Sequence, residues 1–221
     1  MIKIKNYDKD KQKLSFVSDM SVSLANAIRR SVLEIPVMAI DEVEIIKNDS
    51  ALYDEILAHR IGLVPIKTEK AISLSKFKLK ESGPGGVYST DLKPNVGTEF
   101  KIPLVLLEKD QEVEMVCEAS LGKGVDHIKY SPGLIFYRHD LDEDILDFVY
   151  VDNDGKVSFN EDELRNKRVS EDILKKIKSL KDSLGIELNV ESWGQIEVKD
   201  IFLKAIEALE DNLKELEKSV K

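Results

Sequence analysis

The sequence predicts an α+β protein, because segments with a helical period and segments with a strand period both occur along its 221 residues. Residues 23–35 repeat apolar side chains at steps of three and four, which is typical of an amphipathic helix. Residues 200–220 repeat them in the same way. Between these two segments, short runs that are apolar or alternate between apolar and polar residues are typical of strands.

The first predicted helix has an apolar stripe and a polar face beside it. The stripe consists of Leu24, Ile28, Val32 and Ile35. Asn26, Arg29 and Arg30 fall next to one another on the neighbouring face. Ser21 or Ser23 can cap the start of the helix, and Pro36 ends it, because proline has no N–H group to donate.

The chain continues from Pro36 through a predicted strand, helix and strand. Residues 37–46 are strand-like, and a short helix is expected over residues 54–60. Gly62 lies just beyond this helix, where a left-handed stop is common. Residues 63–66 are expected to be extended, with Pro65 at a sheet edge.

Hairpins and short strands are expected elsewhere. Ile2 and Ile4 should pair with Leu14 and Phe16 across a polar turn at residues 8–12. The glycines of residues 83–86 indicate a loop. Further strands are expected at residues 72–79, 100–107 and 112–119.

Residues 150–161 permit two interpretations. If Gly155 takes the sixth position of a calcium loop, the ligand positions three, five and twelve fall on Asp152, Asp154 and Glu161. The first position is then Tyr150, which has no carboxylate. The sequence favours the other interpretation, a hairpin around an Asp-Gly turn. A charged helix follows over residues 168–184, with Ser170 as its cap and an apolar stripe of Ile173, Ile177, Leu180 and Leu184.

The last predicted helix has a heptad pattern. It follows an alternating strand at residues 186–190, and Asp200 is a suitable cap. Its apolar positions step by four, three, four, three and four, and they are Phe202, Ile206, Leu209, Leu213, Leu216 and Val220. A seam of this length at the end of the chain favours contact with a partner over simple packing in the chain's own core.

Composition and charge exclude several classes of protein. The content of 42% hydrophobic and 34% charged residues is typical of a soluble globular protein. The net charge of −9 argues against a free-standing nucleic-acid-binding protein, which needs a basic surface. Neither a signal peptide nor a membrane-spanning run is recognised, so the cytoplasm is the expected location.

The residues that commonly carry chemistry form no recognisable constellation. His59, His127 and His139 lack metal-ligand spacing with one another or with Cys117. Cys117 lies in an alternating run and is expected to be an inert strand residue. Residues 83–86 lack the lysine and hydroxyl of a phosphate loop. We therefore expect no catalytic residue and no metal.

Residues 26–66 contain three distinctive blocks, NAIRR, EIPVMAIDEVEI and DEILAHRIGLVPI. In these blocks the chain resembles the D-subunit family of archaeal RNA polymerases. That family is related to the N-terminal domain of the bacterial alpha subunit and to the third-largest subunit of eukaryotic RNA polymerase II. Residues 121–140, LGKGVDHIKYSPGLIFYRHD, also resemble this family. The resemblance implies a discontinuous dimerisation domain, a sheet with two long helices, at residues 1–46 and 184–221. It implies an inserted, mostly β domain at 47–141 and a reduced third lobe at 142–183.

The resemblance also implies partners. The dimerisation domain would pair with subunit L, through Leu24, Ile28, Val32, Phe202, Ile206, Leu209, Leu213 and Leu216. The inserted domain would reach towards subunits N and P. Asn26, Arg29, Arg30, Asp54, Glu55, His59 and Arg60 match family positions that face the large catalytic subunits, among them the second-largest. Their role would be docking, since nothing here resembles the carboxylates that hold catalytic magnesium.

The sequence departs from the family in one respect. Some archaeal relatives carry cysteines for an iron–sulfur centre in the third lobe, and eukaryotic relatives carry a zinc site in the second. The corresponding residues 142–183 and 78–88 contain no cysteine, so we expect no such cofactor. Two alternative functions remain: a scaffold that pairs with itself, and a calcium-responsive interaction protein that uses Asp152, Asp154 and Glu161.

Overall fold

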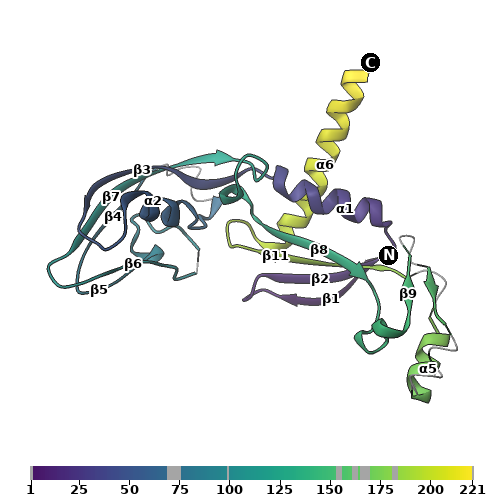
Figure 1. The fold of residues 1–221 in the computed structure, drawn as a ribbon. Helices are drawn as coiled ribbons and strands as arrows, with labels where there is room; N and C mark the ends of the chain where they lie inside the picture. The colour runs from purple at the N-terminus through teal and green to yellow at the C-terminus, as the bar shows by residue number, and fades with distance from the viewer. Residues whose placement is uncertain are drawn as a thin grey trace. The chain divides into compact units, whose positions relative to one another are not determined.

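The computed structural model describes residues 2–68, 76–98, 100–152, 156–160, 164, 170–180 and 184–220, and its sheets and helices confirm the α+β class (Figure 1). The strands are β1 Lys3–Asp8, β2 Lys13–Ser18, β3 Val37–Asn48, β4 Lys76–Ser82, β5 Gly85–Tyr88, β6 Pro103–Leu107, β7 Glu112–Gly122, β8 Gly133–His139, β9 Tyr150–Val151, β10 Val157–Ser158 and β11 Ile186–Ser192. The α-helices are α1 Val22–Ser31, α2 Asp54–Gly62, α5 Glu171–Lys178 and α6 Val198–Val220. The 3₁₀ turns are η1 Val32–Glu34, η2 Ser89–Asp91, η3 Ile128–Tyr130 and η4 Glu143–Phe148.

The chain forms two compact units. Unit 1 contains Met1–Arg29 and Ile135–Val190, and unit 2 contains Arg30–Leu134 and Glu191–Lys221. The division into domains at 1–46 with 184–221, 47–141 and 142–183 stays a prediction. Among the described residues, no helix has the length and apolar character needed to cross a membrane.

Unit 1 is built on a four-stranded sheet in the order β1-β2-β11-β8. The predicted hairpin is confirmed: β1 and β2 are antiparallel, and Ile4 lies opposite Phe16. Leu14 and Phe16 are buried, as are Leu188 and Val190 on β11. Apolar residues alternate along β2 because one face of the sheet is packed and the other meets solvent.

A buried carboxylate lies in an ion-pair network on this sheet. Glu187 of β11 is 4% exposed, and its Oε2 lies 2.8 Å from Lys5 Nζ and 3.4 Å from Arg138 Nε. Lys5 Nζ also lies 2.5 Å from Asp140 Oδ1. Burial disfavours the charged form and would raise the pKa of Glu187, but Lys5 and Arg138 outweigh burial and hold this pKa below its usual value. The network joins residues from both edge strands of the sheet to β11.

The described part of residues 141–184 packs around a small core of its own. Leu141, Ile145, Leu164 and Ile177 are buried there. The helix predicted over residues 168–184 is confirmed only in part as α5, which ends at Lys178, so Leu180 and Leu184 lie beyond it. Residues 168–169 and 181–183 lie outside the described residues. The predicted cap is confirmed, since Ser170 Oγ accepts a hydrogen bond from Ile173 N at 3.4 Å.

The predicted hairpin within residues 150–161 is confirmed as well. β9 and β10 are antiparallel, and Asp152 Oδ1 accepts a hydrogen bond from Lys156 N at 2.8 Å. Of the calcium-loop positions, Asp154, Gly155 and Glu161 lie outside the described residues.

Unit 2 contains a three-stranded antiparallel sheet in the order β3-β7-β4 and a separate pair, β5 and β6. The strand predicted at residues 37–46 is confirmed and extends to Asn48. Helix α2 contributes Leu57 and Ile61, both fully buried, to a core shared with Phe77 and Met115 of the sheet.

The helix predicted over residues 23–35 is shorter than expected. Ser21 caps it, since its Oγ accepts a hydrogen bond from Leu24 N at 3.2 Å, but the α-helical part ends at Ser31. Residues 32–34 form the tighter turn η1, and Ile35 is extended. A proline ring disfavours the helical conformation at the residue before it. Pro36 therefore acts on the backbone of Ile35, in addition to lacking an N–H group at its own position.

The extended segment expected at residues 63–66 was a wrong prediction. Gly62 belongs to α2 rather than stopping it, and Leu63 follows with a right-handed conformation. Val64 N donates to Ile61 O at 3.1 Å, which makes a turn. Val64 and Ile66 are buried in the core of unit 2, so their apolar character serves packing and not a strand ladder.

Two smaller predictions were also wrong. Gly85 and Gly86 are not in a loop, because they open β5 and pair with Leu107 and Leu106. Asp200 does not cap the last helix, since α6 begins two residues earlier at Val198, which is fully buried. The packing of Val198 fixes the start of the helix more strongly than the capping preference of Asp200.

The ion-pair network predicts a pH-dependent effect of Lys5→Met. The depressed pKa of Glu187 stabilises the fold above the ordinary value of 4.5, and this stabilisation is lost as the pH falls through the lower folded-state value. Removing Lys5 leaves the buried carboxylate with only Arg138, so we expect the variant to lose about 1–3 kcal/mol at pH 7, less than for a fully buried pair because Lys5 is partly exposed. The loss should shrink as the pH falls below 4.5 and through the lowered folded-state pKa of Glu187, because the carboxylate is then protonated.

Urea unfolding of wild type and variant at pH 7 and pH 3.5 measures this difference. Lys9→Met, in the exposed turn between β1 and β2, is the matched control and should change neither value. Equal losses at both pH values would contradict the role given to Glu187.

Candidate functional site

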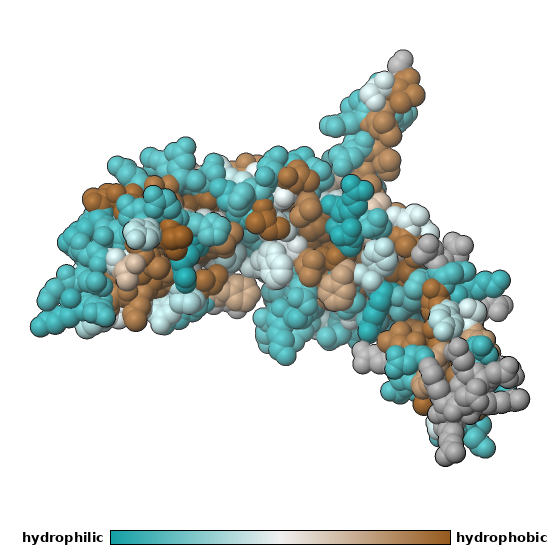
Figure 2. Space-filling view, viewed as in Figure 1, coloured by the Kyte–Doolittle hydropathy of each residue, from teal (hydrophilic) through white to brown (hydrophobic). Residues whose placement is uncertain are grey.

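Helix α6 is covered along only part of its length. Val198, Ile201 and Ala205 are buried, and Phe202, Ile206 and Leu209 are half-buried. Every residue from Glu210 to Val220 is exposed. Leu213, Leu216 and Val220 are 57%, 60% and 80% exposed. Figure 2 shows apolar residues along the end of α6 that carries the C-terminus.

The exposed leucines continue the apolar pattern of the first half of the helix. We name this stripe the α6 seam, and it consists of Phe202, Ile206, Leu209, Leu213, Leu216 and Val220. Its outer half has no packing partner among the described residues, although its heptad spacing is that of a helix packed against another helix. A contiguous apolar stripe that reaches solvent is typical of a protein–protein contact.

The residues that hold α6 in unit 2 were missed by the sequence prediction. Val198, Ile201 and Ala205 recur at steps of three and four, so their period is helical. Their signal in the sequence is weak, because Ala205 is small and Val198 precedes Asp200, the predicted cap. α6 packs beside η1, whose Val32 is buried.

The predicted pairing residues of the first helix are mostly inside the core. Ile28 and Val32 are 4% and 2% exposed, whereas Leu24 is 45% exposed. Of these three side chains, Leu24 alone offers a substantial surface. Whether any of them pairs with another chain stays a prediction.

The polar residues of α1 form a local arrangement. Arg29 Nε and Nη2 both donate to Asn26 Oδ1, at 3.1 and 2.9 Å. Arg29 and Arg30 are exposed. Because the Asn26 amide holds the Arg29 guanidinium in one orientation, Arg29 is prepared to meet a carboxylate or a carbonyl group at low entropic cost.

Helix α2 presents four predicted docking residues, two of which are held by the fold. Asn48 Nδ2 donates to Asp54 Oδ1 at 2.7 Å, and Arg60 Nη2 donates to the Pro103 carbonyl at 2.8 Å. Glu55 and His59 are exposed. Arg60 is therefore not simply a solvated charge, because β6 fixes its guanidinium group.

The same helix carries an exposed apolar stripe that the sequence prediction missed. Tyr53, Ile56 and Leu63 are all exposed, and Arg60 falls between the last two. The steps of three, four and three place these residues on one face. We name this set, with His59, the α2 surface. Its signal in the sequence is the same spacing that marked the last helix, but it spans only three turns.

A groove of about 240 Å³ lies beside the α2 surface. His59 of α2 and Leu63 just after it line one side, and His127 and Lys129 line the groove from the turn after β7. Lys129 Nζ lies 2.5 Å from Asp41 Oδ1, and this ion pair, followed by a hydrogen bond from Ser120, holds the pKa of Asp41 below its usual value. The fold thus brings together two blocks of sequence that lie more than sixty residues apart.

The residues able to perform covalent or metal chemistry are not assembled. Cys117 is buried in β7, and burial raises the pKa of its thiol to about 12, so it is protonated at neutral pH. Among the described residues, no group of three histidine, cysteine or acidic side chains is placed to hold a metal ion. What the described surface offers is apolar stripes flanked by charges, which suits binding to other proteins.

Comparisons with known proteins point in one direction. A family model described as the RNA polymerase Rpb3/Rpb11 dimerisation domain matches residues 16–213. The subunit Rpo3 of DNA-directed RNA polymerase from Pyrococcus horikoshii is 42% identical over 155 residues, which cover 63% of this chain. The match spans only 60% of that relative, less than two thirds of its length.

Other relatives align over more of their length. Rpo3 from Methanocaldococcus jannaschii is 40% identical, and the match covers 67% of this chain and 82% of the relative. Rpo3 from Halobacterium salinarum is 30% identical, with 96% of this chain and 95% of the relative covered.

The burial of α6 predicts that its two apolar stripes differ in their effect on stability. Ile201→Ala should lower the free energy of unfolding by about 2–4 kcal/mol, because it leaves a cavity in the core. Leu213→Ala should change it by less than about 0.5 kcal/mol, because Leu213 is exposed. Urea unfolding of the isolated chain measures both values. Equal losses would mean that the outer half of α6 packs against its own chain.

Proposed function

The chain belongs to the RNA polymerase Rpb3/Rpb11 dimerisation-domain family, and from this premise we propose that it is an assembly subunit of an archaeal DNA-directed RNA polymerase. It pairs with polymerase subunit L through the α6 seam and Leu24. The pair is the platform on which the second-largest catalytic subunit and subunits N and P assemble. The observation that carries this proposal is the exposed outer half of the α6 seam.

The seam has enough apolar surface to support a stable pair. Full burial of a leucine or valine side chain contributes about 1.5–3 kcal/mol, so Leu213, Leu216 and Val220 together favour association by several kcal/mol. The entropy lost on association offsets much of this gain. Leu209, the half-buried leucine of the seam, adds to the gain.

A second copy of this chain is the alternative occupant of the seam. The apolar pattern alone fits either partner. The net charge of −9 disfavours the second copy, because two identical chains would bring like charges together. Subunit L is therefore the partner that we propose.

The α2 surface is the proposed contact with the large catalytic subunits. Tyr53, Ile56 and Leu63 supply apolar area, and Arg60 supplies donors that β6 holds in place. Asn26, Arg29 and Arg30 of α1 and Asp54, Glu55 and His59 of α2 complete the proposed docking residues. An apolar centre with a charged rim is the usual build of such interfaces.

We propose no catalytic group and no cofactor in this chain. Nucleotidyl transfer with magnesium belongs to the large subunits in this proposal. The absence of cysteines from residues 78–88 and 142–183 supports the lack of a thiolate-bound zinc or iron–sulfur centre. The proposed location is the cytoplasm, where the polymerase acts.

The seam proposal predicts that Leu213→Asp with Leu216→Asp prevents pairing with subunit L, because carboxylates would be buried without partners. We expect affinity to fall at least about 100-fold, measured by calorimetry and by the mass of the co-expressed complex. Leu203→Asp is the control on the same helix, since Leu203 is 55% exposed but lies off the seam. A one-to-one complex that survives the double substitution would overturn the seam as the pairing face, and a homodimer of the wild type would favour self-pairing.

The α2 proposal predicts a later defect in assembly. Ile56→Asp with Leu63→Asp should leave pairing with subunit L intact and prevent recruitment of the second-largest subunit, because the apolar centre of the contact is lost. Stepwise reconstitution followed by size-exclusion chromatography separates the two stages. Leu106→Asp on β6 is the matched control at another exposed leucine. Normal recruitment by the double variant would exclude the α2 surface from this contact.

A further inference from the structure

The α2 surface is small for a contact with a large subunit. A stable protein–protein interface takes about 20–30 residues from each side. The exposed apolar residues of the α2 surface are three, Tyr53, Ile56 and Leu63. Leu63 also lines the groove of about 240 Å³, and His127 and Lys129 line the same groove from the turn after β7. The contact therefore needs more of the chain, and the groove leads from α2 to a second segment.

This second segment is a loop, residues 122–128, that presents apolar side chains to solvent. Val125 is 54% exposed and Ile128 is 65% exposed. Single exposed apolar residues are common on protein surfaces. These two lie beside His127 in the sequence, and His127 borders the groove that Leu63 borders on the other side. Exposed apolar area is therefore present on both sides of the groove.

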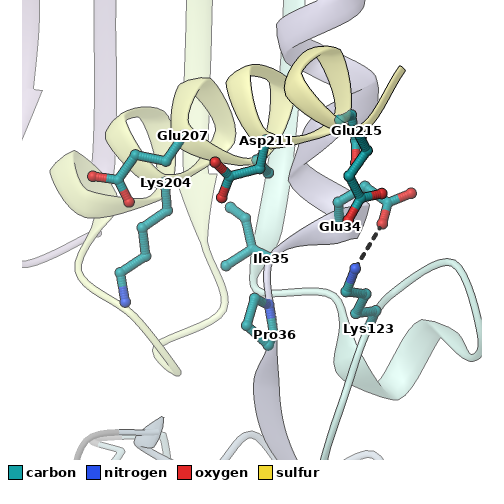
Figure 3. Close-up of a pocket in the computed structure, with 10 residues that line it drawn as sticks. Glu34, Ile35, Pro36, Lys123, Lys204, Glu207, Asp211 and Glu215 are labelled. Carbon is teal, nitrogen blue, oxygen red and sulfur yellow. Dashed lines mark hydrogen bonds and ion pairs between the residues drawn. The ribbon is translucent and has the colours of Figure 1, made fainter. Parts of the chain in front are cut away.

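The loop is fixed to turn η1. Lys123 Nζ lies 3.2 Å from Glu34 Oε2, as the dashed line in Figure 3 shows, and Val125 N donates to Leu33 O at 3.1 Å. A Cβ atom on Gly124 would lie 3.2 Å from Leu33 Cα, so the loop backbone approaches η1 more closely than another residue would allow. A loop held in this way loses little entropy when a partner binds.

His127 is held as a hydrogen-bond donor. Its Nδ1 accepts a hydrogen bond from Lys129 N at 3.1 Å. Nδ1 therefore carries no proton, and Nε2 carries one, because a neutral imidazole has one donor and one acceptor nitrogen. The Nε2–H group is what His127 can offer to a ligand, and its counterpart has to be an acceptor.

The charges in the groove favour a neutral acceptor. Lys129 Nζ lies 2.5 Å from Asp41 Oδ1, so the two charges compensate each other, and Ser120 Oγ donates to Asp41 Oδ2 at 3.1 Å. Val43 and Leu63 supply apolar lining. A peptide carbonyl suits such a site better than a carboxylate does, because removing a carboxylate from water costs far more.

We propose that the 122–128 loop and the groove extend the α2 surface into one docking surface for the second-largest catalytic subunit. The inference deepens the proposed function and rests on it. A segment of that subunit crosses the groove and packs apolar side chains on Leu63, Val125 and Ile128. One of its peptide carbonyl groups accepts a hydrogen bond from His127 Nε2. Continuity selects this subunit, since a chain seated on α2 needs to cross only the groove to reach the loop.

Photo-cross-linking in the polymerase purified from its own cells tests the occupant. The photoreactive amino acid benzoylphenylalanine in place of Ile128 should form a covalent link to the second-largest subunit. The same probe in place of Leu106, which is 70% exposed on β6, is the control and should form no such link. The absence of a link from position 128, or a link only to another subunit or to a second copy of this chain, would show that the proposed occupant is wrong.

Affinity measurements test the apolar part of the contact. Val125→Asp with Ile128→Asp should weaken binding of the second-largest subunit to the pair with subunit L at least about 30-fold, measured by interferometry. Leu106→Asp with Leu203→Asp makes the same change in charge at exposed leucines and should bind as the wild type does. Both variants should still pair with subunit L, which shows that they fold. Wild-type affinity in the loop variant would exclude the loop from the contact.

Two variants of His127 test the chemistry of the acceptor. His127→Phe keeps a ring but removes the donor, so we expect binding about tenfold weaker at both about 100 mM and about 1 M salt. His127→Gln keeps a donor and should lose less than about threefold. Equal losses in the two variants would exclude the hydrogen bond. A loss that disappears at high salt, where charges are screened, would identify a carboxylate and not a peptide carbonyl.

The outcomes separate this inference from the proposed function. If Ile56→Asp with Leu63→Asp prevents recruitment while the loop variants recruit normally, the contact ends at α2, and the proposed function stands without its extension. If no polymerase subunit accompanies the wild-type chain from its own cells, both proposals fail.

Discussion

The incomplete burial of α6 is the constraint on which the rest of the structure depends. Three residues, Val198, Ile201 and Ala205, anchor a helix of 23 residues in unit 2. The outer half keeps the same apolar period, but its side chains are exposed and meet no core among the described residues. In the pairing that we propose, a partner chain covers these side chains, so that each of the two chains supplies one side of a shared core.

Apolar and charged groups are combined in the same manner at each surface. On α2, the stripe of Tyr53, Ile56 and Leu63 lies beside a guanidinium held by a backbone carbonyl. On α6, the apolar seam and the carboxylates of Glu207, Asp211 and Glu215 occupy opposite sides of one helix. Apolar area supplies affinity with little directional preference, whereas fixed charges select orientation and partner. A subunit that contacts several neighbours needs fixed charges at each contact, because they select the partner and its orientation.

Much of the secondary structure could be predicted from periodicity, because strand and helix periods follow from which face is buried. The hairpin β1–β2, the long strand β3 and the capped helix α5 follow this rule. The failures occur where tertiary contacts override local preference. Val64 and Ile66 are apolar because they fill the core of unit 2, and Val198 starts α6 ahead of the better cap, Asp200. The α2 stripe was missed because three turns of helix give too short a pattern. The groove beside α2 is lined by residues near His59 and residues near His127. These blocks lie far apart in the sequence, so only the fold shows that they are neighbours.

The environment of Cys117 has a practical consequence. This is the single cysteine of the chain, it lies inside β7, and its thiol is protonated at neutral pH. Reagents that need a thiolate will therefore react poorly with Cys117 at neutral pH. Cysteines introduced at solvent-facing positions are thus the only reactive thiols of the chain. Two of them can carry a pair of dyes or spin labels that reports distances within a larger assembly, without first removing a native residue.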